Sequence, residues 1–219
     1  MSRLRSIVRG AAGAALIVGY EIGAHRAVST PGLEPLGLAL VLAPALVLAL
    51  GYAARSPRRA VLLPLVAMAA AGLWLARGAL VRHYEWGLFL EHVLFNGALG
   101  YLFGRTLVQG RVPLCTQFAA LVRGNPLAPE IAVYTRRVTA AWTLFFAFVV
   151  AVSTLLFATV PIEVWSTFAN YLTLPLTALM FIAEHACRRF ALPGVRSSGM
   201  VASIRAYRRS TAGRPAAQR

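Results

Sequence analysis

Residues 139–160 read TAAWTLFFAFVVAVSTLLFATV, a run that contains no charged side chain. A bilayer-spanning helix needs about 20 consecutive apolar residues, so this run is long enough to cross a membrane. Five further stretches are apolar enough to do the same, namely residues 8–25, 34–54, 60–76, 86–104 and 164–187. The sequence therefore predicts an all-α, polytopic membrane protein with about six transmembrane helices.

The arginines fall on alternate sides of these six stretches. The chain has 22 arginines and no lysine, and 19 of the arginines lie before or at the start of the first stretch or follow the second, fourth and sixth. The other three are Arg26, Arg77 and Arg82. Because cytoplasmic loops of membrane proteins carry an excess of basic residues, this bias predicts that both chain ends lie in the cytoplasm.

The composition agrees with one membrane domain. A chain of 219 residues that is 58% hydrophobic and 13% charged lacks the polar shell of a soluble domain. We expect a single helical transmembrane domain over residues 1–189, followed by a basic, disordered tail over residues 190–219. The net charge of +15 is spread over every inner loop without a nucleic-acid-binding motif. Anionic lipids or an acidic cytoplasmic protein are therefore the expected partners.

Missing residue types exclude several kinds of chemistry. Without lysine the chain offers no Schiff base and no phosphate-binding loop, and without aspartate it offers no aspartyl phosphate. It also has no GxSxG nucleophile motif. Cys115 and Cys187 are expected to face the cytoplasm as free thiols and have no metal-binding spacing. We therefore predict no metal and no cofactor.

Residues 1–28 have two interpretations. Three arginines precede the apolar run AAGAALIVGY, which is the pattern of a signal peptide as well as of a first transmembrane helix. We expect the segment to be retained as a helix, and cleavage is the alternative.

The fourth apolar stretch carries Glu91, His92 and Asn96 in its outer half. Ionisable residues at membrane depth are costly, so they are functional candidates that face a protein interior or a wet cavity. Glu91 and His92 are thus candidates for an acid and a base. The alternative is that Glu91 lies close enough to the surface to reach water.

The connection between the fourth and fifth stretches, residues 105–138, is patterned. After Pro113, Leu114, Phe118, Leu121 and Val122 recur at helical spacing. This spacing predicts a short amphipathic helix on the inner leaflet.

A second helix is expected to begin at Glu130 and to continue into the fifth stretch. Tyr134 follows Glu130 by four residues and Arg137 follows it by seven, so all three share one helix face. One interpretation is that Arg136 or Arg137 binds a phosphate or carboxylate that Glu130 and Tyr134 orient. The other interpretation is structural. Arg136 and Arg137 extend their charges to the membrane surface, and Glu130 stabilises the first turn of the helix.

The sixth stretch has a proline, Pro175, that predicts a kink, and polar residues at its inner end. Glu184 precedes Arg188 by four residues, which is the favourable spacing for an ion pair on a helix. Glu184 and His185 are alternatively an acid and base. His185 and Cys187 alone are too few for a zinc site.

Two segments carry a family resemblance. Residues 113–146, PLCTQFAALVRGNPLAPEIAVYTRRVTAAWTLFF, and residues 165–189, WSTFANYLTLPLTALMFIAEHACRR, resemble a family of bacterial inner-membrane proteins. The genes of that family lie among those for aryl polyene or xanthomonadin-type pigments, whose acyl chains are built on acyl carrier proteins. The resemblance covers about residues 105–189 and implies a bacterial inner-membrane location. Some members are labelled ketosynthases, but Cys115 and His185 do not form the catalytic set of such an enzyme.

These observations favour a non-enzymatic membrane component that assists the assembly or export of an aryl-polyene-type lipid. We expect it to dock an acidic acyl carrier protein or a lipid at its cytoplasmic face. The expected binding residues are Arg123, Glu130, Tyr134, Arg136, Arg137 and Arg188. Alternatives are an intramembrane acyl or lipid transferase, which would use Glu184 with His185 or Glu91 with His92, and a small-solute permease, for which no internal repeat is found.

Overall fold

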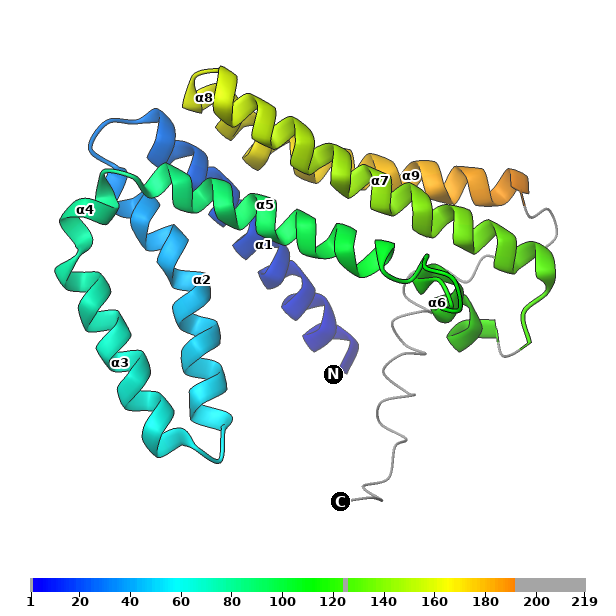
Figure 1. Ribbon diagram of the computed structural model, residues 1–219, viewed down its shortest axis with the longest axis horizontal. Helices are drawn as coiled ribbons and strands as arrows, with labels where there is room; N and C mark the ends of the chain where they lie inside the picture. Colours follow the sequence, from blue (N-terminus) through cyan, green and yellow to red (C-terminus); the bar gives the residue numbers. More distant parts are fainter. Residues whose placement is uncertain (1, 124–125, 192–219) are drawn as a thin grey trace. The chain divides into compact units, whose positions relative to one another are not determined.

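The computed structural model describes residues 2–123 and 126–191, except for the side chains of residues 2–7, 9 and 123. Within these ranges the chain forms helices and turns and no strand, which confirms the predicted all-α class (Figure 1). The tail expected over residues 190–219 lies, after Ala191, outside the described residues.

The described helices follow one another with short connections. In chain order they are α1 (Ser2–Ser29), α2 (Glu34–Arg55), α3 (Arg59–Leu75), α4 (Arg77–Val81), α5 (Tyr84–Gly104), α6 (Leu114–Arg123), α7 (Pro129–Thr159), α8 (Ile162–Ser166), the π-helix η1 (Thr167–Leu172) and α9 (Thr173–Ala191).

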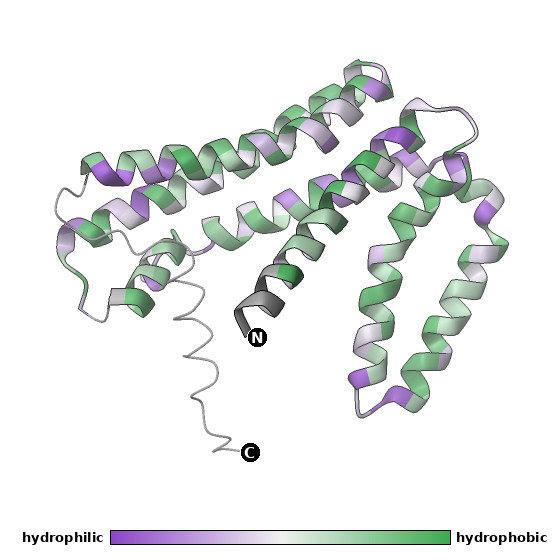
Figure 2. Ribbon diagram, turned by 180° about the vertical axis from the view of Figure 1, so that it is seen from behind, coloured by the Kyte–Doolittle hydropathy of each residue, from purple (hydrophilic) through white to green (hydrophobic). Residues whose placement is uncertain are grey.

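Among the described residues, three helical segments are long and apolar enough to cross a membrane by length and composition: Glu34–Arg55, Pro129–Thr159 and Ile162–Ala191. Helix α3 is apolar but has 17 residues, while α5 has 21 residues but includes Glu91 and His92. In Figure 2 hydrophobic residues dominate α2 and α3, and hydrophilic ones mark the turn between them. The chain thus has the helices of a membrane protein, while six spans with both ends inside stay a prediction.

The contacts divide the chain into two compact units. The first unit contains residues 1–94 and 152–175, and the second contains residues 95–151 and 176–219. Each unit is described by itself below. The expected single domain over residues 1–189 stays a prediction.

In the first unit, α1 and α2 pack against each other, and small residues of both helices are buried. Ala24 and Ala27 of α1 are almost fully buried. Gly37 of α2 lies so close to the ring of Tyr84 that a Cβ atom there would overlap the ring. The Tyr84 hydroxyl donates a hydrogen bond of 2.7 Å to the Ala27 carbonyl. One tyrosine therefore joins three segments of this unit.

The helix changes from α-type to π-type hydrogen bonding before Pro175. Residues Thr167–Leu172 form a π-helix, and the amide of Thr173 bonds to the carbonyl of Phe168, five residues earlier. Proline has no amide hydrogen and disturbs the regular ladder of the preceding turn. Wide π turns are frequent at sites where a helix bends or carries function. A π-helix thus precedes Pro175, and the kink predicted at Pro175 stays a prediction.

In the second unit, aromatic residues of α7 form the core. Trp142 lies 6.0 Å from Phe103 of α5 and 4.5 Å from Phe181 of α9, measured between ring centroids. Phe146 is also buried beside them. Aromatic packing of this kind adds about 0.5–1.5 kcal/mol per pair beyond area burial. The cluster holds α5, α7 and α9 together within this unit.

Helix α6 is attached to α7 through hydroxyl groups. The hydroxyls of Thr116 and Thr135 are 2.7 Å apart, and the amide of Cys115 donates to the Thr139 hydroxyl at 3.2 Å. These bonds satisfy polar groups at the start of α6 that the helix itself leaves unpaired. The apolar side chains of Phe118 and Leu121 are 37% and 42% exposed. The face toward the protein is therefore polar and the outward face apolar. Its placement on the inner leaflet stays a prediction.

Candidate functional site

An open cavity of about 450 Å³ lies in the second unit, between the first turns of α7 and the end of α9. Three of the predicted binding residues line it together, namely Glu130, Tyr134 and Arg137. The structure thus brings together the residues that the helical spacing places on one face. We call this the Arg137 cavity; its lining residues are Pro129, Glu130, Val133, Tyr134, Arg137 and Ala191.

Arg137 is exposed in this cavity. Within the described residues, no hydrogen bond or ion pair occupies its guanidinium. Val133, one helical turn away, is 53% exposed and gives the cavity an apolar wall. A planar guanidinium presents paired N–H groups that match a carboxylate or phosphate. The cavity therefore has the chemistry of a site for an anionic group with an apolar neighbour.

Tyr134 and Arg188 both donate hydrogen bonds to Glu184. The Tyr134 hydroxyl donates to the carbonyl of Glu184 at 3.1 Å. The carboxylate of Glu184 accepts bonds from Arg188, at 2.9 Å from Nε and 2.5 Å from Nη2. The predicted i, i+4 ion pair is thus present, and its side chains are only 15% and 29% exposed. Arg188 is held by Glu184, so its charge is less available to a ligand than that of Arg137.

The other predicted arginines differ from Arg137. Arg136 donates from Nη2 to the carbonyl of Leu107 at 3.1 Å, which ties α7 to the segment after α5. The side chain of Arg123 lies outside the described part of the structure. Of the neighbouring pair Arg136 and Arg137, only the second points its charge into the cavity.

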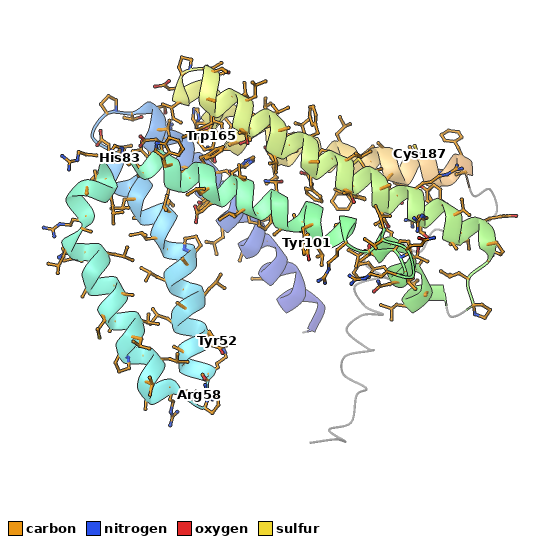
Figure 3. All side chains as sticks on the ribbon, in the orientation of Figure 1. Tyr52, Arg58, His83, Tyr101, Trp165 and Cys187 are labelled. Atoms are coloured by element: carbon orange, nitrogen blue, oxygen red, sulfur yellow. The ribbon has the colours of Figure 1, made fainter. Side chains whose placement is uncertain are left out.

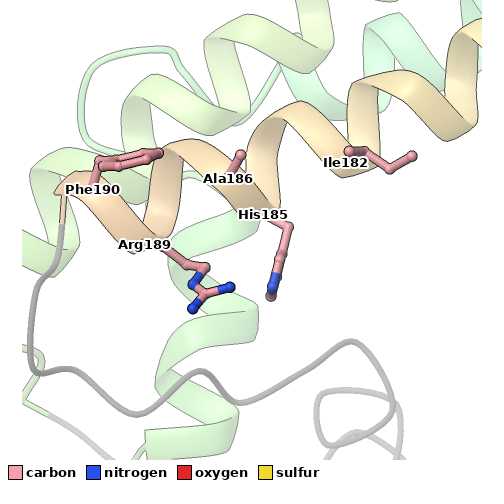
Figure 4. Close-up of a pocket in the computed structure, with 5 residues that line it drawn as sticks. All are labelled: Ile182, His185, Ala186, Arg189 and Phe190. Carbon is pink, nitrogen blue, oxygen red and sulfur yellow. The ribbon is translucent and has the colours of Figure 1, made fainter.

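His185 does not pair with Glu184. Consecutive residues on a helix point in different directions, and His185 is exposed on another side of α9. It lines a second open cavity of about 470 Å³ with Arg189, as Figure 4 shows. The proposed acid–base pair of Glu184 and His185 is therefore not brought together.

The first unit contains a buried polar network around His92. His92 Nδ1 lies 3.1 Å from the Ser153 hydroxyl, and Nε2 lies 3.2 Å from the Thr173 hydroxyl. Ser153 also accepts a hydrogen bond of 3.0 Å from Nε1 of Trp165, which Figure 3 labels. Ser153 and Trp165 are almost fully buried. The network therefore joins α5, α7, α8 and α9 in this unit.

The direction of these hydrogen bonds follows from Thr173. Its hydroxyl donates to the Phe168 carbonyl at 3.0 Å, so it can only accept from His92. Nε2 of His92 therefore donates to Thr173, and in the neutral tautomer with its hydrogen on Nε2 the other nitrogen, Nδ1, accepts from Ser153. Both ring nitrogens are thereby occupied within the protein, which leaves His92 without a nitrogen directed at a substrate.

Glu91 has a different partner from His92. Its carboxylate accepts a bond of 2.6 Å from the Tyr20 hydroxyl of α1. Nδ1 of His25, also on α1, lies 3.1 Å from the Ser166 hydroxyl, which accepts from Asn170 at 2.9 Å. The candidate acid and base Glu91 and His92 therefore belong to separate contacts.

The partners in these contacts were not among the predicted site residues. Ser153 is one of several hydroxyl residues in the apolar run 139–160, so nothing in the run singles it out. The described residues contain no group of three or more His, Cys or acidic side chains that could hold a metal ion. Comparison of the chain with protein-family models, curated proteins and solved structures finds no match.

Proposed function

We propose that this chain is a non-enzymatic component of a bacterial inner membrane that assists assembly or export of an aryl-polyene-type lipid. In this proposal it crosses the membrane six times with both ends inside, and α6 rests on the inner leaflet. It holds an acidic acyl carrier protein at its cytoplasmic face. The observation that supports docking is Arg137, whose charge is exposed in an open cavity and has no partner within the described residues.

The charge distribution supports an acidic partner. The segments proposed to be cytoplasmic carry 19 arginines and only two acidic residues, Glu130 and Glu184. A face of one sign attracts partners of the opposite sign and raises their rate of association. Acyl carrier proteins are acidic, so they fit such a face.

The geometry of the second unit supports a common side for these residues. The hydrogen bond from Tyr134 to Glu184 brings the first turns of α7 next to the last turns of α9. Because these are opposite ends of two long apolar helices, both ends emerge at the same membrane surface in this proposal. Arg137 and Val133 then face the cytoplasm and offer a charged and an apolar contact.

Arg137→Gln tests the docking proposal. Purified protein is reconstituted in neutral lipid vesicles, and the binding of the pathway's acyl carrier protein is measured by vesicle flotation. Loss of one hydrogen bond to a charged group costs about 1.5–3 kcal/mol, so binding should weaken by about tenfold or more.

The matched control is Arg58→Gln, in the exposed turn between α2 and α3 that Figure 3 labels. It removes the same charge from the same proposed face, and Arg58 does not line the Arg137 cavity. We expect a much smaller loss of binding. Equal losses for the two variants would mean general attraction and no specific site, and a wild-type protein that does not bind the carrier would disprove docking.

A further inference from the structure

We propose that the cavity of His185 and Arg189 on α9 binds one anionic glycerophospholipid, with the lipid phosphate between these two side chains. This site does not depend on docking of a carrier protein, and it is separate from the Arg137 cavity in its lining residues. It requires only that the apolar segment Ile162–Ala191 crosses a membrane.

Two hydrogen-bond donors meet on one face of α9. His185 and Arg189 are four residues apart, which is the spacing at which side chains of a helix are neighbours. Figure 4 shows both side chains on the same side of the helix. Among the described residues, none forms a hydrogen bond or ion pair with either group. The imidazole and the guanidinium are therefore available to share one phosphate.

Exposed apolar side chains border the two donors. Phe190 is 87% exposed and Ile182 is 65% exposed. Both line the cavity with the two donors. Full burial of one such side chain is worth about 1.5–3 kcal/mol, so this face favours a ligand that is partly hydrocarbon. A phospholipid combines an anionic group and acyl chains, and a free phosphate does not.

The order of residues along α9 matches the orientation of a lipid. Ile182 precedes Arg189 by seven residues, which is about 10 Å along a helix. Arg189 lies in the last turn of α9, where the helix leaves the apolar segment, and Ile182 lies deeper within that segment. A phosphate at Arg189 therefore places the acyl chain along Ile182.

The site should prefer a net negative lipid to a zwitterionic one. The nearest acid on this helix, Glu184, accepts two hydrogen bonds from Arg188 and is not available to a lipid cation. The choline group of a zwitterionic lipid would instead lie beside His185 and Arg189, which offer it no negative charge. Phosphatidylglycerol is thus the expected ligand class, because it presents a phosphate without a cation.

Native mass spectrometry of the full chain in mild detergent tests this site. Phosphatidylglycerol and phosphatidylcholine with identical acyl chains are titrated separately, and we expect phosphatidylglycerol to bind about tenfold more tightly. In the double variant His185→Gln, Arg189→Gln this preference should disappear. Arg189→Lys should retain part of it, because lysine keeps the charge but lacks the planar pair of donors.

Arg58→Gln is the control, and it should keep the full preference. Equal binding of the two lipids by the wild-type protein would overturn the proposal. An equal effect of Arg58→Gln would do so as well, because it would mean that total charge alone selects the lipid. If the double variant does not fold, Arg189→Lys, which should retain only part of the preference, and the Arg58→Gln control still decide. The carrier protein is absent from this assay, so its result is independent of the docking experiment.

Discussion

Ser153→Ala should destabilise the protein although it removes only one oxygen atom. The Ser153 hydroxyl accepts a bond from Trp165 Nε1 and, by the direction derived above, donates to His92 Nδ1. All three side chains belong to the first unit, and Ser153 is fully buried. Alanine would leave an indole N–H and an imidazole nitrogen without partners in an apolar interior.

Two estimates bracket the magnitude. Each buried polar group left unpaired costs about 1–3 kcal/mol in soluble proteins, which gives about 2–6 kcal/mol for the pair. Within a membrane the unfolded helices also find partners, and single interhelical hydrogen bonds average about 0.6 and reach about 1.7 kcal/mol. The membrane estimate applies to an apolar helical chain. For the two hydrogen bonds we therefore expect the free energy of unfolding to fall by about 1–3 kcal/mol.

Unfolding by sodium dodecyl sulfate in mixed micelles measures this loss, with tryptophan fluorescence as the signal. Thr159→Ala is the matched control on the same helix, since its exposed hydroxyl bonds only to the carbonyl of Leu155, four residues earlier. It should change the free energy of unfolding by less than about 0.5 kcal/mol.

A double-mutant cycle with Trp165→Phe isolates the bond itself. If Trp165 Nε1 depends on Ser153, the Ser153→Ala change should cost less when Trp165 is already phenylalanine. The coupling should be about 0.5–1.5 kcal/mol. Additive effects, or a Ser153→Ala variant as stable as Thr159→Ala, would refute the role given to the network.

Two further predictions concern packing and topology. Gly37→Ala should destabilise the protein by about 1–3 kcal/mol, because the new methyl group overlaps the Tyr84 ring, whereas Gly97→Ala has open space and should be neutral or slightly stabilising in the same unfolding assay. A membrane-impermeant maleimide should label exposed Cys187 faster than half-buried Cys115, because burial raises the pKa of the Cys115 thiol and only thiolates react. Labelling of Cys187 should need access from the cytoplasmic side, and labelling in intact cells would contradict the proposed topology.

Features that depend on spacing within one helix could be predicted from the sequence. The ion pair of Glu184 and Arg188 follows from four-residue spacing, and it is present. Glu130, Tyr134 and Arg137 share a helix face for the same reason and line one cavity. Helix geometry alone sets these relations, so no knowledge of the tertiary structure is needed.

Contacts between helices could not be predicted in this way. His92 and Ser153 are 61 residues apart, and their pairing depends on how α5 and α7 are rotated against each other in the first unit. An apolar helix with several hydroxyl residues gives little indication of that rotation, because lipid and protein interior are both apolar. The hydrogen bond that distinguishes Arg136 from Arg137 likewise depends on the position of the segment around Leu107.

Helix α6 shows a further limit of periodicity. Its spacing predicts an apolar face but does not say whether that face meets protein or lipid. In the structure Thr116 and the amide of Cys115 face α7, while Phe118 and Leu121 are partly exposed. In water the apolar face would turn inward. In the proposed placement on the inner leaflet, lipid removes that preference and hydrogen bonds decide the orientation.

The attachment of α6 has a consequence for the order of biogenesis. Its partners Thr135 and Thr139 on α7 lie 19 residues after Thr116 and 24 residues after Cys115, respectively. Because chains emerge from the ribosome with the N-terminus first, α6 is made before the helix that satisfies its polar face. In the proposed placement on the inner leaflet, α6 rests on lipid through its apolar side until α7 has inserted. The polar groups of α6 that bond to Thr135 and Thr139 are therefore satisfied only after α7 has been inserted.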